Sequence, residues 1–165
     1  MFKNILFILF FTLTSNVASC QTSVNSEQQV LTGISNVRIL ERGVAYRWYK
    51  DGYFNYQPNL SAVEVIKQAA PNVSFIIFAG TWCIKSRDIL PHFFKIMDLV
   101  GIACQCITFC FLDRDFRSLA GFESVYGIYS TPVIIVLNEK AEIGRITENI
   151  SHSVEADIAD VLPQK

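Results

Sequence analysis

The sequence predicts an α/β fold in which helices cover both faces of a central mixed β-sheet. Its apolar and amphipathic runs follow the order strand, helix, strand, helix, strand, strand, helix. A right-handed strand–helix–strand unit that leads into a hairpin and a closing helix produces a sheet of this kind. The chain has 165 residues, of which 51% are hydrophobic, so one domain with a packed core is expected.

A capped helix precedes the first strand of the predicted sheet. Ser61 and Glu64 have the spacing of a capping box, and apolar residues share one helical face until Pro71 ends the helix. The run 73–78 is rich in Phe and Ile, which is typical of a buried strand.

The longest predicted helix runs from Thr81 to about Leu99 and has a continuous apolar side. Pro91 lies inside it, so a kink is expected about two turns after Cys83. The elements that follow complete the sheet and cover it. They are a buried strand at 107–112, a short helix at 119–126 that Gly127 stops, a hairpin of strands at 133–137 and 143–146, and an amphipathic helix at 153–162.

The chain is predicted to divide into four parts. They are a signal peptide at 1–20, a flexible polar tether at 21–29, an aromatic-rich extension at 30–57 and the folded domain at 58–165. The spacing of Val44, Trp48 and Tyr49 in the extension suggests a short helix that stops near Asp51-Gly52. Its aromatic side chains are expected to pack against a neighbouring element.

Residues 1–20 have the pattern of a secretory signal, with Lys3 near the start, an apolar run at 5–13 and small residues before Cys20. This ending resembles the bacterial lipobox, which implies that Cys20 is lipidated and anchors an exported protein in the cell envelope or periplasm. Ordinary cleavage near Ser19 would leave Cys20 incidental. No other run is long and uncharged enough to cross a bilayer, so a membrane is contacted through the lipid anchor only.

Cys83 follows the strand 73–78 at the predicted start of the longest helix. A helix N-terminus offers free N–H groups and the positive end of the dipole, which stabilise a thiolate over a thiol. The thiolate is the nucleophile in disulfide chemistry, so this position favours a reactive cysteine. A buried cysteine acting as a small hydrophobe is the alternative, but Trp82 and the strand–turn–helix context favour reactivity.

This corner and the element order resemble the thioredoxin family over roughly residues 60–162. The matching positions are Phe78 on the strand, Trp82-Cys83 at the corner, Pro91 in the helix, Thr131-Pro132 before a strand and Gly144-Arg145-Ile146 in the hairpin. The resemblance implies a thioredoxin fold. Secreted bacterial thioredoxin-like proteins are the most similar members.

The resemblance also implies roles for individual residues. Cys83 matches the nucleophile, with Trp82 as the aromatic wall beside it and Ile84 as a neighbour within the motif. Pro132 matches a cis-proline that faces the cysteine and leaves the backbone of Thr131 free to bind an extended substrate strand. An ordinary trans proline at the start of an edge strand is the alternative.

The chain departs from the family pattern at two positions. Ser86 replaces the second cysteine, so the dithiol motif becomes Cys-x-x-Ser and cannot release a mixed disulfide by itself. Ile77 replaces the buried acid that assists the second cysteine. Ser86 is expected to donate a hydrogen bond to the Cys83 thiolate, and Lys85 to favour the charged form.

These residues predict thiol–disulfide exchange with one catalytic cysteine, Cys83, modulated by Ser86. The expected partners are protein or small-molecule disulfides and an external thiol or redox partner protein, in an isomerase- or reductase-like cycle. The alternative is a redox-inactive, chaperone-like binding module on the same fold. The client and the direction of exchange are not readable from the sequence.

Other chemistry is not expected. The net charge of −1 and the scattered basic residues exclude a nucleic-acid partner. His92 and His152 stand alone, so neither a metal nor a cofactor is predicted, and the loop 113–115 is expected to be solvated. Three further cysteines, Cys104, Cys106 and Cys110, favour packing in a buried strand, although Cys104 and Cys106 could also form a strained disulfide or supply a resolving thiol.

Overall fold

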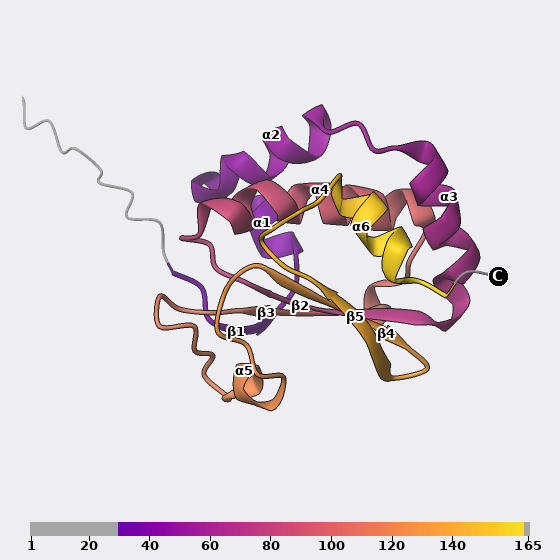
Figure 1. Cartoon of the computed structure of the whole chain (residues 1–165). Coiled ribbons are helices and arrows are strands. Elements are labelled where there is room, and N and C mark those ends of the chain that lie inside the picture. Colours follow the sequence, from indigo (N-terminus) through magenta and orange to yellow (C-terminus); the bar gives the residue numbers. More distant parts are fainter. Residues whose placement is uncertain (1–29, 164–165) are drawn as a thin grey trace, which may run out of the picture.

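Five strands form one mixed sheet in the order β1-β3-β2-β4-β5 (Figure 1). The computed structural model describes residues 30–163, so the predicted signal peptide, Cys20 and the tether lie outside the described residues. The strands are β1 (Gly33–Ser35), β2 (Val73–Ala79), β3 (Ile107–Phe111), β4 (Val133–Asn138) and β5 (Ala141–Ile146). The central strand β2 is parallel to β3 and antiparallel to β4. The predicted α/β class with a mixed sheet is confirmed.

Helices cover both faces of the sheet, but unequally. The helices are α1 (Arg38–Arg42), α2 (Arg47–Asn55), α3 (Leu60–Ala69), α4 (Ile84–Val100), α5 (Phe122–Val125) and α6 (Val154–Val161). Among the described residues, only α5 lies on the second face, and the other five helices lie on the first (Figure 1). None of the helices in residues 30–163 is long and apolar enough to span a membrane.

The central strand explains why both faces are apolar. Side chains alternate along a strand, and in β2 Phe75 and Ile77 enter the larger core beneath the helices of the first face. Ile76 and Phe78 enter the smaller core on the α5 side. Both sets are almost completely buried, so β2 reads as a continuous apolar run.

The aromatic-rich stretch 30–57 takes part in the fold. It contributes β1 to the sheet edge, and α2 packs along α4. The predicted helix stop at Gly52 is wrong, because α2 continues to Asn55. A Cβ atom at Gly52 would lie 2.6 Å from Cγ of Pro91, so glycine at this position allows α2 to approach α4 closely. This tertiary packing offsets the cost of about 1 kcal/mol for a helical glycine.

Helix ends also differ from the predicted ones. Asn59, rather than Ser61, caps α3, because its side-chain oxygen accepts hydrogen bonds from the N–H groups of Ser61 and Ala62. Helix α4 begins at Ile84 with Cys83 as its N-cap and runs through Pro91 to Val100. Ser153 is the N-cap of α6, and its hydroxyl accepts the N–H of Ala156 at 3.3 Å.

Candidate functional site

The candidate site lies at the corner between β2 and α4. The N–H of Cys83 bonds the carbonyl of Gly80 at 3.0 Å, which closes a turn and places Cys83 at the start of α4. A Cβ atom at Gly80 would lie 2.6 Å from Nε1 of Trp82, so glycine lets the indole lie across the turn. Trp82 Nε1 donates to the carbonyl of Leu112 at 3.0 Å, which fixes the ring beside the partly exposed thiol.

The loop before β4 brings Thr131 and Pro132 to this corner. The Thr131–Pro132 peptide bond is cis, as the family resemblance implied. The Cys83 thiol donates to the backbone carbonyl of Thr131 across 3.3 Å. Residues 48 positions apart in the sequence therefore meet at the thiol.

The Thr131 side chain adds a feature that the sequence did not reveal. Its hydroxyl is buried and makes no hydrogen bond within the described residues. The Cys83 thiol donates to the Thr131 carbonyl, and a thiol sulfur is only a weak acceptor for the Thr131 hydroxyl. Loss of the Cys83 proton makes the sulfur a stronger acceptor for this hydroxyl. Sequence reasoning assigned only the Thr131 backbone, because burial of a hydroxyl leaves no local pattern.

The surroundings of Cys83 hold its pKa below that of an ordinary thiol. Burial raises the pKa, but hydrogen bonding from the Thr131 side chain, the Ser86 N–H and hydroxyl, and the Lys85 N–H lowers it further than burial raises it. Lys85 thus acts through its backbone, and its ammonium group is not among these causes. The predicted role of the Lys85 charge is not supported. Ile84, the first residue of α4, is 79% exposed beside the thiol.

Ser86 and Ile77 occupy the two positions at which the chain departs from the family pattern. Ser86 is fully buried, and its Oγ accepts the N–H of Gly80 at 3.2 Å. Its hydroxyl proton therefore remains available for the Cys83 sulfur. Ile77 is fully buried in the larger core, so an apolar side chain fills the position of the family's buried acid.

The other described cysteines do not reach Cys83. Cys104 and Cys106 form a short turn before β3, and all four described cysteines are free thiols. Because β2 and β3 are parallel, with Ala79 opposite Phe111, this turn lies at the other end of the sheet, about 16 Å or more away. This separation excludes a resolving role for Cys104 and Cys106 within the same molecule. Cys104 is exposed, so its predicted packing role is wrong, whereas Cys110 is fully buried as expected.

His92 and Asp113, two polar residues outside the Cys83 corner, both contact neighbouring residues of the fold. The ring of His92 stacks on Tyr56 at 3.7 Å between centroids. The carboxylate of Asp113 accepts the N–H groups of Asp115 and Arg117, each at 2.9 Å, and so orders its own loop. Among residues 30–163, no group of three or more His, Cys, Asp or Glu side chains could hold a metal ion.

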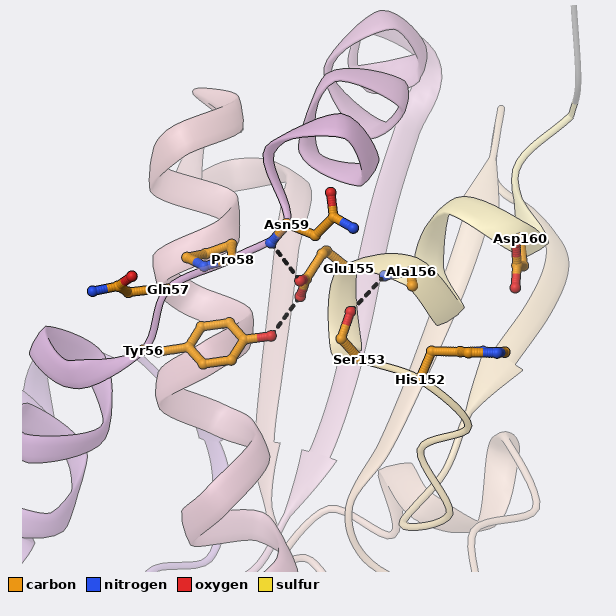
Figure 2. A pocket seen from close by; sticks show the side chains of 9 residues that line it. All are labelled: Tyr56, Gln57, Pro58, Asn59, His152, Ser153, Glu155, Ala156 and Asp160. Atoms are coloured by element: carbon orange, nitrogen blue, oxygen red, sulfur yellow. Dashed lines mark hydrogen bonds between the residues drawn. The ribbon is translucent and has the colours of Figure 1, made fainter.

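A hollow of about 700 Å³ lies between the α2–α3 connection and α6 (Figure 2). Figure 2 shows Glu155 between the two segments, where it accepts hydrogen bonds from the Tyr56 hydroxyl at 2.6 Å and the Asn59 N–H at 2.7 Å. Both carboxylate oxygens of this buried residue are thus engaged. Glu155 ties α6 to the start of α3 and offers no free group for chemistry.

Comparisons with known proteins find similar solved structures but no matching family model or curated sequence. A crystal structure of a protein of unknown function from Pseudomonas aeruginosa aligns with a TM-score of 0.50 at 16% identity, covering 72% of this chain and 74% of that one. Thioredoxin from Fasciola hepatica aligns at 0.40, with 16% identity over 59% of this chain and 84% of that one. Mitochondrial thioredoxin 3 from Saccharomyces cerevisiae aligns at 0.39, with 19% identity over 66% and 94%.

The strand order and the corner that joins β2 to α4 define a thioredoxin-like fold. Within that fold, this chain has one cysteine at the corner, in the sequence Trp-Cys-Ile-Lys-Ser. The cis peptide bond at Pro132 faces this cysteine.

Proposed function

We propose that the chain catalyses thiol–disulfide exchange with Cys83 as its single nucleophile. The observation that carries the proposal is the position of Cys83, a partly exposed thiol at the N-cap of α4 beside Thr131 and the cis bond to Pro132, where hydrogen bonding lowers its pKa. An environment that favours the thiolate is what a nucleophilic cysteine requires.

The reaction has two steps. The Cys83 thiolate attacks one sulfur of a substrate disulfide, forms a mixed disulfide and releases the other sulfur as a thiolate. A second thiol then attacks the mixed disulfide on the substrate sulfur and regenerates the Cys83 thiolate. When the second thiol belongs to the same substrate, the substrate disulfide is isomerised. When external thiols act in turn, the substrate is reduced and the external thiols become a disulfide.

Because no other cysteine of residues 30–163 is placed to attack the mixed disulfide, we propose that the second thiol comes from another molecule. Ser86 cannot serve, and Cys104 and Cys106 lie at the far end of the sheet. Thr131 and Pro132 would hold an extended substrate segment beside Trp82. We further propose that the protein works in the cell envelope, exported and anchored through a lipid on Cys20.

Alkylation of Cys83 across pH tests this proposal. In a Cys20→Ser, Cys104→Ser, Cys106→Ser variant the reaction reports on Cys83, because Cys110 is fully buried, and a Cys83→Ala version provides the blank. We expect alkylation to follow an apparent pKa below the unperturbed value of about 8.5, and glutathione disulfide to give a mixed disulfide that Cys83→Ala does not form. An apparent pKa at or above that value, with no adduct by intact mass, would contradict the proposal.

A binding module without redox turnover is the second candidate function. The absence of a resolving thiol within reach of Cys83 in residues 30–163 favours it. Under this alternative, Cys83→Ala would suppress the aggregation of an unfolded client as well as the unmodified chain does. Loss of that suppression in Cys83→Ala would favour the exchange function.

A further inference from the structure

A pocket of about 340 Å³ lies where α1 and α2 meet the end of α4, away from the thiol. The residues that line it combine aromatic rings with acidic groups and one lysine. They are Glu41, Tyr49, Lys50, Tyr53, Phe54 and Asp98. Cys83 is the N-cap of α4, and Asp98 lies fifteen positions later, near the end of this helix. The two residues are therefore separated by about 22 Å along the helix axis.

Tyr49 is the most informative residue of this pocket. Its side chain is only 3% exposed, yet its hydroxyl makes no hydrogen bond within residues 30–163, and the causes that act on it are burial and nearby charge. Burial, Glu41 and Asp98 raise the pKa of Tyr49 far above that of an ordinary tyrosine. The hydroxyl is not among the buried side-chain atoms of residues 30–163 that lack a partner, so it is accessible in the pocket that Tyr49 lines and is available to a ligand.

The acidic groups have free oxygens that face the same space. The Tyr53 hydroxyl donates to one oxygen of Asp98 at 2.5 Å. Within the described residues, the other Asp98 oxygen and the Glu41 carboxylate accept no hydrogen bond and form no ion pair. Burial, the hydrogen bond to Asp98 and the charges of Asp98 and Glu41 raise the pKa of Tyr53 to about 12. The pocket is therefore rich in acceptors.

The aromatic rings suit a cation with an apolar stem. The Lys95 ammonium already lies 5.8 Å from the centroid of the Tyr53 ring. It donates to the carbonyl of Tyr56 and does not line the pocket. Phe54 at the rim is 74% exposed. Aromatic faces attract ammonium groups and pack against the methylene groups that carry them.

We propose that this pocket binds a primary alkylammonium group, as carried by a free amine or by the lysine side chain of a peptide. Glu41 and Asp98 accept two of its N–H groups, and the Tyr49 hydroxyl accepts the third. The alkyl stem lies against Tyr53 and Phe54. The inference does not depend on the chemistry of Cys83.

Lys50 provides a charge test of the proposal. It lines the pocket, is exposed, and would repel a bound ammonium group. Lys50→Gln should therefore tighten binding, whereas Glu41→Gln should weaken it. Glu41 is exposed and makes no side-chain hydrogen bond or ion pair within residues 30–163, so its replacement leaves the fold intact. Glu64→Gln on α3 makes the same charge change outside the pocket and is the matched control.

The experiment is an NMR titration of the full chain with n-butylammonium chloride. We expect saturable shifts at Tyr49 and Tyr53, and binding that is weakened about two- to fivefold by Glu41→Gln and about two- to tenfold by Tyr49→Phe. Lys50→Gln should tighten it about two- to fivefold. Glu64→Gln and Cys83→Ala should leave it unchanged.

Two further probes define the ligand. Tighter binding of Nα-acetyl-lysine N-methylamide than of n-butylammonium would assign the site to peptide lysines, and the reverse order to free amines. The proposal is overturned if n-butanol binds as well as n-butylammonium, if the shifts do not saturate, or if Glu41→Gln and Glu64→Gln have the same effect.

Discussion

Replacing Thr131 by valine should stabilise the fold and make Cys83 less reactive. The hydroxyl of Thr131 is buried, with the whole residue only 3% exposed, and it has no hydrogen-bond partner within residues 30–163 while Cys83 is a thiol. Valine keeps the shape of the side chain and removes the unsatisfied group. The same change removes a hydrogen bond that lowers the Cys83 pKa, so stability and reactivity should change in opposite directions.

The magnitude follows from the cost of a buried polar group without a partner, about 1–3 kcal/mol. We expect Thr131→Val to raise the free energy of unfolding by about 1 kcal/mol or more, which moves the urea midpoint by about 0.5 M. This gain should shrink as pH rises. The folded-state pKa of Cys83 is lowered, so the stability that ionisation gives the unmodified chain grows as pH rises from that pKa to the unfolded value of about 8.5 and is fully present above it. Thr131→Val gains less from ionisation.

Urea unfolding below and above the Cys83 pKa, combined with alkylation across pH, measures both effects. Thr108→Val in β3 makes the same chemical change at a position that is not among the causes of the Cys83 shift, so it is the control. Destabilisation by Thr131→Val at acidic pH, or an alkylation profile equal to that of the unmodified chain, would refute the reasoning.

Two other substitutions test neighbouring parts of the structure. Glu155→Gln should cost about 1.5–3 kcal/mol near neutral pH, because buried Glu155 accepts two hydrogen bonds as a carboxylate. Burial raises the pKa of Glu155, but the hydrogen bonds lower it overall. The unmodified chain should therefore lose this stability as pH falls below about 4.3, and its free energy of unfolding should approach that of Glu155→Gln. Equal unfolding curves at neutral pH would disprove this. Ser86→Cys should let a second thiol attack the Cys83 mixed disulfide, so that intact mass detects less adduct with glutathione disulfide; undiminished adduct would show that the buried position cannot resolve it.

The sequence was most informative where the determinants are local. Apolar runs identified β2, β3 and β4, because strands that are buried on both faces have continuous apolar sequences. The apolar stripe identified α4, because a helix buried on one face has apolar residues at helical spacing. The end of α2 was misjudged because glycine is a local helix breaker, whereas here Gly52 allows close packing against Pro91. Asn59 and Ser61 are both acceptable caps, and the path of the chain selects Asn59.

The candidate site divides in the same way. Cys83, Trp82 and Ser86 are close in sequence, so the corner could be predicted from one short stretch. Thr131 lies 48 positions from Cys83, and only the resemblance to a family related the two. Cys104 is exposed before β3, whereas Cys110 is buried within it. This difference depends on where the strand begins and on which elements cover each face of the sheet.

The separation of Cys83 from Cys104 and Cys106 also affects how the protein associates when it is oxidised. Within residues 30–163, the accessible thiols lie at opposite ends of the sheet, with Cys83 after β2 and the other two before β3. A disulfide between two Cys83 thiols closes a symmetric dimer, but one between Cys83 and Cys104 joins unlike ends. Each added molecule then presents a fresh thiol, so head-to-tail linkage can extend without closing. Oxidative storage would therefore yield open polymers as well as dimers.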